Sequence, residues 1–158
     1  MEIDSLFGLP AHPLLVHAAV VLLPLAAILT IVCAAVPKAR RCFAPVALGL
    51  AIVAVIAVGV AQGSGEALEE HVKETTLVEQ HTEQGESVLP WAIAVTVAAG
   101  AVVAIPLLMK RRPNLSGQTV TAVVVVVSLI AGAGAMWKIV EVGHSGAKAT
   151  WNDVGNGK

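Results

Sequence analysis

The residues of this sequence that are best suited to chemistry are five histidines. An imidazole can ligate haem iron, zinc, copper or non-haem iron through one ring nitrogen. Carboxylates accompany the histidines, and a carboxylate either joins a metal's ligand set or orients a ligating imidazole. The candidate ligands are His12, His17, His71, His81 and His144, and the candidate carboxylates are Glu66, Glu70 and Glu141.

Two of these histidines have informative neighbours. His17 lies inside an apolar stretch that begins at Leu14. Because an unpaired polar group in such a stretch costs free energy, we expect this imidazole to face the interior of a helical bundle. Glu141 precedes His144 by three residues, about one helical turn, and can orient its ring. We therefore predict a metal centre with His17, His81 and His144 at its core.

Four apolar runs must position these side chains. Of the 158 residues 56% are hydrophobic and 13% are charged, and the mean hydropathy of +0.81 is far above that of a soluble domain. Each run matches the roughly 20 residues with which a helix crosses a bilayer, and in lipid an unpaired strand cannot satisfy its amides. The sequence predicts an all-α integral membrane protein, an antiparallel four-helix bundle that forms a single domain over 1–158. The predicted spans are 14–36, 43–61, 88–109 and 119–140.

Charge is distributed unevenly between the connections. The connections after the first and third spans hold six of the ten basic residues, namely Lys38, Arg40, Arg41, Lys110, Arg111 and Arg112. All eleven acidic residues lie in the N-terminus, in the connection between the second and third spans, or in the tail from Glu141. The positive-inside rule assigns the basic connections to the cytoplasm, so both termini are predicted to be extracytoplasmic.

The connection between the second and third spans, residues 62–87, contains no proline and is rich in glutamate, alanine, leucine and glutamine. These residues favour helix, so we expect both spans to continue as helices beyond the membrane, with a turn near Thr75 and Thr76. At 1.5 Å per helical residue, the five histidines lie about 29 to 42 Å from the cytoplasmic boundary. They are predicted to form one layer at the outer interface.

Three segments of the chain resemble a known family. LPAHPLLVHAAVVLLPLA (9–26), HTEQGE (81–86) and GHSGAKATW (143–151) are similar to the domain of unknown function 2231 family of small bacterial membrane proteins. The resemblance extends over nearly the whole chain. Its motif histidines correspond to His12, His17, His81 and His144, and His71 lies outside its motifs.

Members of that family are often joined to cytochrome c or Rieske iron–sulfur modules. The resemblance therefore implies a protein of the bacterial inner membrane that works near extracytoplasmic electron transfer. An extracytoplasmic redox protein or a respiratory complex is the implied partner, together with the lipid bilayer.

Three hypotheses follow for the histidine layer. The first is a b-type haem for electron transfer, which suits diagonal helices because neighbouring helix axes lie only about 8 to 10 Å apart. In a sequential up-down bundle this pairs His17 with His81 and His71 with His144. The second is a haem-free zinc, copper or iron site built from His12, His17, His81 and His144 with Glu66, Glu70 or Glu141. The third is an accessory or assembly subunit without a cofactor.

Other functions have little basis in the sequence. The net charge of −1 provides no basic surface for nucleic acid. The chain has no GxSxG, HExxH, CxxCH or phosphate-binding glycine loop, so a hydrolase or transferase is not indicated. No ionisable side chain falls at the middle of a span, which disfavours a transporter.

Overall fold

The computed structural model describes residues 5–6, 9–69, 71–72 and 75–155, which fold into helices preceded by one short strand pair. The strands β1 (Ser5–Leu6) and β2 (Leu9–Pro10) pair in antiparallel register. The helices are α1 (Ala11–Ala35), α2 (Pro37–Glu69), α3 (Thr76–Glu86), α4 (Val88–Arg111) and α5 (Gly117–Gly155). The predicted helical fold is confirmed, and the four predicted spans coincide with the apolar parts of α1, α2, α4 and α5.

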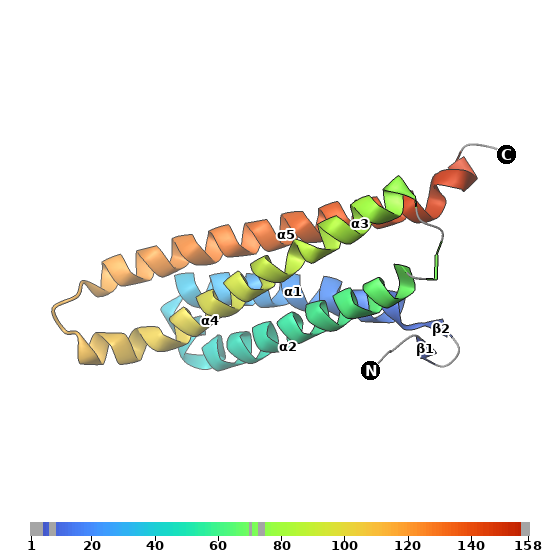
Figure 1. The fold of residues 1–158 in the computed structure, drawn as a ribbon. Coiled ribbons are helices and arrows are strands. Elements are labelled where there is room, and N and C mark those ends of the chain that lie inside the picture. Colours follow the sequence, from blue (N-terminus) through green and yellow to red (C-terminus); the bar gives the residue numbers. More distant parts are fainter. Residues whose placement is uncertain (1–4, 7–8, 70, 73–74, 156–158) are drawn as a thin grey trace.

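Four helices of the described chain are long and apolar enough to cross a membrane. The α1–α2 turn and the α4–α5 loop lie at one end of the molecule, whereas β1, β2, α3 and the last turns of α5 lie at the other (Figure 1). We call these the basic end and the outer end, after the charge distribution and the orientation that it predicts. α1 packs on α2 and α5, and α4 packs on the same two helices. α1 and α4 are therefore diagonal to each other.

Small side chains form the contact surfaces between these helices. The buried side of α2 repeats at steps of three and four residues, which is the spacing of a packed helical seam. Alanine dominates the core, so the helix axes can approach closely, as is usual in membrane bundles. The buried residues of the α2 seam are Ala44, Ala47, Ala51, Ala54, Val58 and Ala61.

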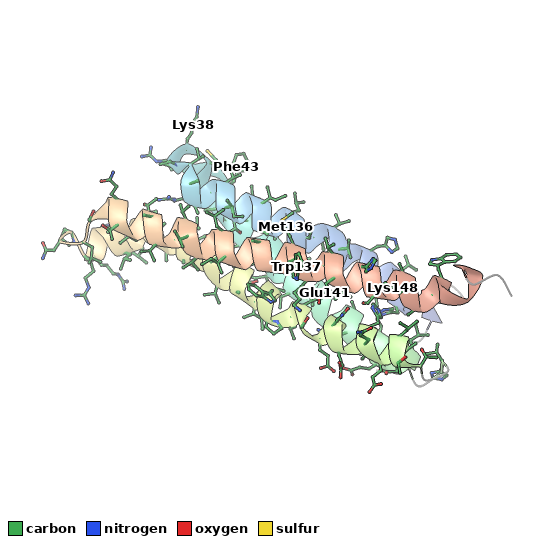
Figure 2. The ribbon with its side chains drawn as sticks, turned by 90° about the horizontal axis from the view of Figure 1, so that it is seen from above. Lys38, Phe43, Met136, Trp137, Glu141 and Lys148 are labelled. Atoms are coloured by element: carbon green, nitrogen blue, oxygen red, sulfur yellow. The ribbon has the colours of Figure 1, made fainter. Side chains whose placement is uncertain are left out.

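Large apolar side chains cover the outside of the bundle. Val97, Trp137 and Val140 are 65%, 71% and 70% exposed. Trp137 and Met136 lie on α5 between the basic end, marked by Lys38, and the outer end, marked by Lys148 (Figure 2). A soluble monomer rarely exposes so large an apolar surface, so lipid is the expected solvent for this part of the chain.

The helical extension predicted within residues 62–87 is confirmed in α2 up to Glu69 and in α3. α2 continues to Glu69, and α3 begins after Thr75, whose Oγ1 accepts a hydrogen bond from the Val78 amide at 3.3 Å. The Gln62 side chain donates from Nε2 to the Gly85 carbonyl at 2.8 Å. This bond fixes the outer part of α2 against α3.

Candidate ligand-binding cleft at the outer end

A cleft of about 680 Å³ opens where α1, α2, α3 and α5 converge at the outer end. Its volume lies within the range of cofactor and small-molecule sites, and its wall is mainly apolar. Several polar side chains also face it: His12, His17, Gln62, Glu66, Glu69, Thr75, His81, Thr82, Glu86 and Thr150.

His12, in the first turn of α1, is half-buried in this cleft and is fixed by α2. Its Nδ1 lies 3.1 Å from the Ala61 carbonyl oxygen and 3.1 Å from Ser64 Oγ. Because a carbonyl only accepts, the ring proton belongs on Nδ1. The Ser64 hydroxyl donates its own proton to the Ala61 carbonyl at 2.8 Å, so its oxygen is also free to accept. The His12 Nε2 therefore keeps its lone pair for a ligand.

His81, on α3, is fixed by α5 in the same way. Its Nδ1 lies 3.1 Å from Ser145 Oγ, and the Ser145 hydroxyl donates to the Val142 carbonyl at 3.1 Å. Since that hydroxyl has only one proton, the ring Nδ1–H must donate to the serine oxygen. His81 thus also presents an unprotonated Nε2.

The surroundings of His12 and His81 also resemble each other in that a glycine lies beneath each imidazole ring. A methyl group on Gly65 would lie 3.0 Å from His12 Cε1, and one on Gly146 would lie 2.9 Å from His81 Cε1. The sequences AQGSG (61–65) and VGHSG (142–146) therefore place a carbonyl, a serine and a glycine at equal spacing. The first unit lies on α2 and holds His12 of α1, and the second lies on α5 and holds His81 of α3.

The surroundings of His81 favour its neutral form. α3 carries three glutamates and lies beyond the apolar spans. Burial lowers the pKa of His81, the neighbouring His12 lowers it further, and the Val142 carbonyl offsets part of the effect. His12 and His81 border the same cleft. A neutral imidazole is the form that binds a metal.

The other predicted histidines occupy different places. His17 lines the cleft but is exposed, and its Nδ1 donates to the Pro13 carbonyl of its own helix; the expected inward orientation is not found. His71 is exposed and donates to the Ala67 carbonyl at 2.9 Å. His144 is exposed on α5. Neither His71 nor His144 is among the residues that line this cleft.

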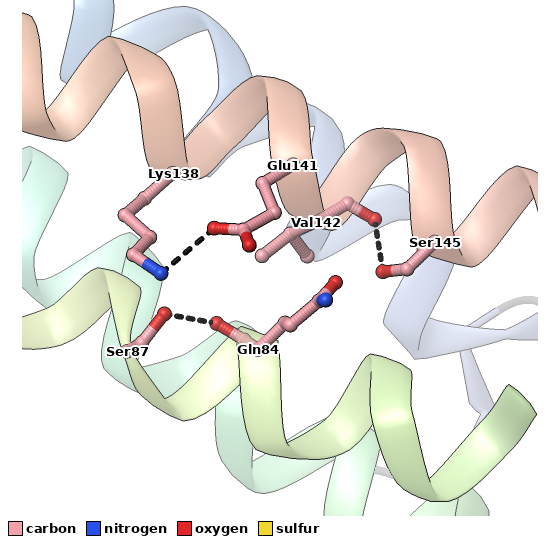
Figure 3. Close-up of polar contacts among 6 residues, drawn as sticks. All are labelled: Gln84, Ser87, Lys138, Glu141, Val142 and Ser145. Carbon is pink, nitrogen blue, oxygen red and sulfur yellow. Dashed lines mark hydrogen bonds and ion pairs between the residues drawn. The ribbon is translucent and has the colours of Figure 1, made fainter. Parts of the chain in front are cut away.

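The predicted carboxylates are also separated. Glu66 lines the cleft, and Glu70 lies outside the described residues. Glu141 forms an ion pair with Lys138 at 2.7 Å, and Figure 3 shows its carboxylate turned toward that ammonium group. Within the described ranges, no three side chains of histidine, cysteine, aspartate or glutamate gather closely enough to hold a metal ion.

Sequence reasoning missed the residues that hold the two rings, Ser64 and Gly65 on α2 and Ser145 and Gly146 on α5. The available signal was the Ser-Gly dipeptide, which is repeated at the outer ends of α2 and α5. The sequence-based hypotheses include His12 only in the haem-free metal set, whereas the structure places it in the same cleft as His81.

Comparison with known proteins supports the family resemblance. The family model described as "Predicted membrane protein (DUF2231)" matches residues 8–157. No curated protein matches the chain significantly. No solved structure does so either. The match spans both helix pairs and both Ser-Gly units, and the chain therefore belongs to the DUF2231 family of predicted membrane proteins.

Proposed function

We propose that the outer cleft binds one b-type haem, which His12 and His81 would hold through their Nε2 atoms. The observation that carries this proposal is the matched pair of imidazoles, each held through Nδ1 beside a serine. A ligating histidine ordinarily donates its other ring N–H to a fixed acceptor, which sets the tautomer and the orientation of the ring. Both rings meet this requirement and border the same apolar cleft.

The composition of the cleft favours haem over a bare metal ion. Two imidazoles without a third close ligand leave a bare ion poorly coordinated, whereas a porphyrin brings four ligands and needs two axial partners. Gly65 and Gly146 leave room for the two imidazole rings, and the rest of the wall is mainly apolar, as a porphyrin face requires. His12 comes from α1 and His81 from α3, which leads into α4, so the ligands come from diagonal parts of the bundle.

When bound, the haem would supply one-electron redox chemistry. The chain's own contribution is to hold two neutral imidazoles, to exclude water with apolar walls, and to present the site at the outer end. An extracytoplasmic redox protein or a respiratory complex is the corresponding partner. The function that we propose is therefore electron transfer at the outer surface of the bacterial inner membrane.

An optical spectrum of the detergent-purified protein tests this proposal directly. We expect a Soret band and, after reduction, the sharp visible bands of a low-spin b-type haem, at one haem per chain. Metal analysis of the same sample identifies the alternatives. Stoichiometric zinc, copper or non-haem iron would replace this proposal with the haem-free metal site, and absence of both after reconstitution with hemin would favour an accessory subunit.

We propose an antiparallel orientation in which the basic end faces the cytoplasm and both termini face outward, because lysine and arginine accumulate at cytoplasmic loops. The chain contains a native probe, since Cys42 is exposed near the basic end while Cys33 is buried. A membrane-impermeant maleimide is expected to label Cys42 in inverted vesicles but not in intact spheroplasts. Ala147→Cys in a Cys42→Ser background should give the opposite pattern, and labelling of Cys42 from outside would reverse the orientation.

A further inference from the structure

A second pocket, of about 500 Å³, lies at the basic end between the first turns of α2 and the last turns of α4. Arg40 and Arg41 border it from α2, and Val102 and Val103 contribute apolar wall from α4. It is separate from the outer cleft, with which it shares no residue. The pocket therefore combines cationic and apolar surface at the level where a membrane's head groups begin.

Among the described residues, no ion pair neutralises the positive charge at this end. All eleven acidic residues belong to the outer segments. Arg40 is committed to the end of α1, where its Nε donates to the Cys33 carbonyl at 3.1 Å and its Nη2 donates to the Ala34 carbonyl. Arg41 is exposed beside it. Its guanidinium therefore has all of its donors available for an anion from outside the protein.

Two prolines add hydrogen-bond acceptors to the same pocket. Pro45 in α2 and Pro106 in α4 lack an N–H, so the carbonyls four residues earlier, those of Arg41 and Val102, lose their helical donor. All four of these residues border the pocket. In a membrane such carbonyls need another donor, because lipid tails provide none.

We infer that this pocket binds one molecule of an anionic phospholipid whose head group carries hydroxyls, such as phosphatidylglycerol. Its phosphate accepts charge-assisted hydrogen bonds from Arg41. Its glycerol hydroxyls donate to the carbonyl of Arg41, which is exposed and lacks its helical donor, whereas Val102 is fully buried. One acyl chain lies along Val103 and Pro106, both of which are exposed. Free phosphate would meet only the first of these requirements, and a zwitterionic choline lipid lacks the hydroxyl donors and the net charge.

Native mass spectrometry of the full-length protein in detergent, titrated with phosphatidylglycerol or phosphatidylcholine, tests the site. We expect one phosphatidylglycerol to be retained in preference to phosphatidylcholine. Arg41→Gln should weaken this retention by about tenfold or more, the usual effect of losing a hydrogen bond to a charged group. Arg111→Gln is the matched control, since it removes the same charge at the same end from a residue that does not line the pocket.

Arg41→Lys and a circular dichroism spectrum of each variant separate loss of the site from loss of the fold. The lysine variant should keep part of the binding, because it retains the charge. Equal losses in the Arg41→Gln and Arg111→Gln variants would overturn the inference in favour of general charge attraction. Complete displacement of the lipid by millimolar inorganic phosphate would also overturn it, because the site would then recognise a free anion.

Discussion

Alanine at either His12 or His81 is expected to remove most of the haem from the purified protein. Each substitution deletes one of the two proposed Nε2 ligands that border the cleft, and a single remaining ligand in an open cleft would retain haem poorly. The ratio of Soret absorbance to protein concentration measures the loss. The variants should still insert into the membrane, because neither side chain belongs to the apolar seams between the helices.

Three other histidine variants serve as controls for this result. His71→Ala and His144→Ala should keep nearly all of the haem, because both side chains are exposed and neither lines the cleft. His17→Ala distinguishes the two pairings, since His17 does line the cleft. Loss of haem in His17→Ala together with retention in His12→Ala would replace our ligand pair with His17 and His81.

Serine variants separate ligation from positioning. In Ser64→Ala and Ser145→Ala the imidazoles remain but lose the oxygen that lies 3.1 Å from each Nδ1. Outer partners of this kind usually change metal affinity by about 10- to 100-fold. We therefore expect haem to bind more weakly, with a shifted reduction potential but an unchanged low-spin spectrum, and the effect should be smaller in Ser64→Ala because the Ala61 carbonyl still accepts from His12. A high-spin spectrum would mean that a ligand had been lost rather than misdirected.

The helices could be predicted from the sequence because lipid imposes a simple requirement on each apolar run. A stretch such as Val123 to Val127 favours strand in water, but it is helical in α5 because only helix satisfies its amides in hydrocarbon. The small-residue seams and the extension of α2 to Glu69 follow equally from local composition. The composition of each local segment of the sequence was sufficient to predict these features.

The arrangement of the site could not be predicted in the same way. His12 is held by Ser64, which lies 52 residues further along the chain. Whether His12 or His17 points inward depends on the rotation of α1 about its axis, and counting heights along ideal helices does not determine this rotation. Glu141 illustrates the same difficulty. Lys138 and His144 are each three residues from it, and the carboxylate pairs with the ammonium group, the stronger partner.

The contact that fixes α5 against α4 is the most sensitive packing position that the structure identifies. A methyl group on Gly134 would lie 1.9 Å from Trp91 Cζ3 and 2.1 Å from Trp91 Cε3. No side chain tolerates such distances, so the indole would have to leave its place against the core or the helices would have to separate. Overpacking of this kind typically costs about 1 to 3 kcal/mol.

Gly134→Ala is therefore expected to lower the free energy of unfolding by about 1 to 3 kcal/mol in a detergent unfolding titration. Gly143→Ala, on the same helix, is the matched control because a methyl group there meets nothing within 4 Å. The control should be neutral or slightly stabilising, since alanine favours helix. Trp91→Ala combined with Gly134→Ala should recover part of the loss, because the two residues are in contact.

Because α5 also carries Ser145, displacement of this helix should weaken haem binding in Gly134→Ala but not in Gly143→Ala. Equal stability of the two glycine variants would show that the α4–α5 contact is looser than the structure indicates.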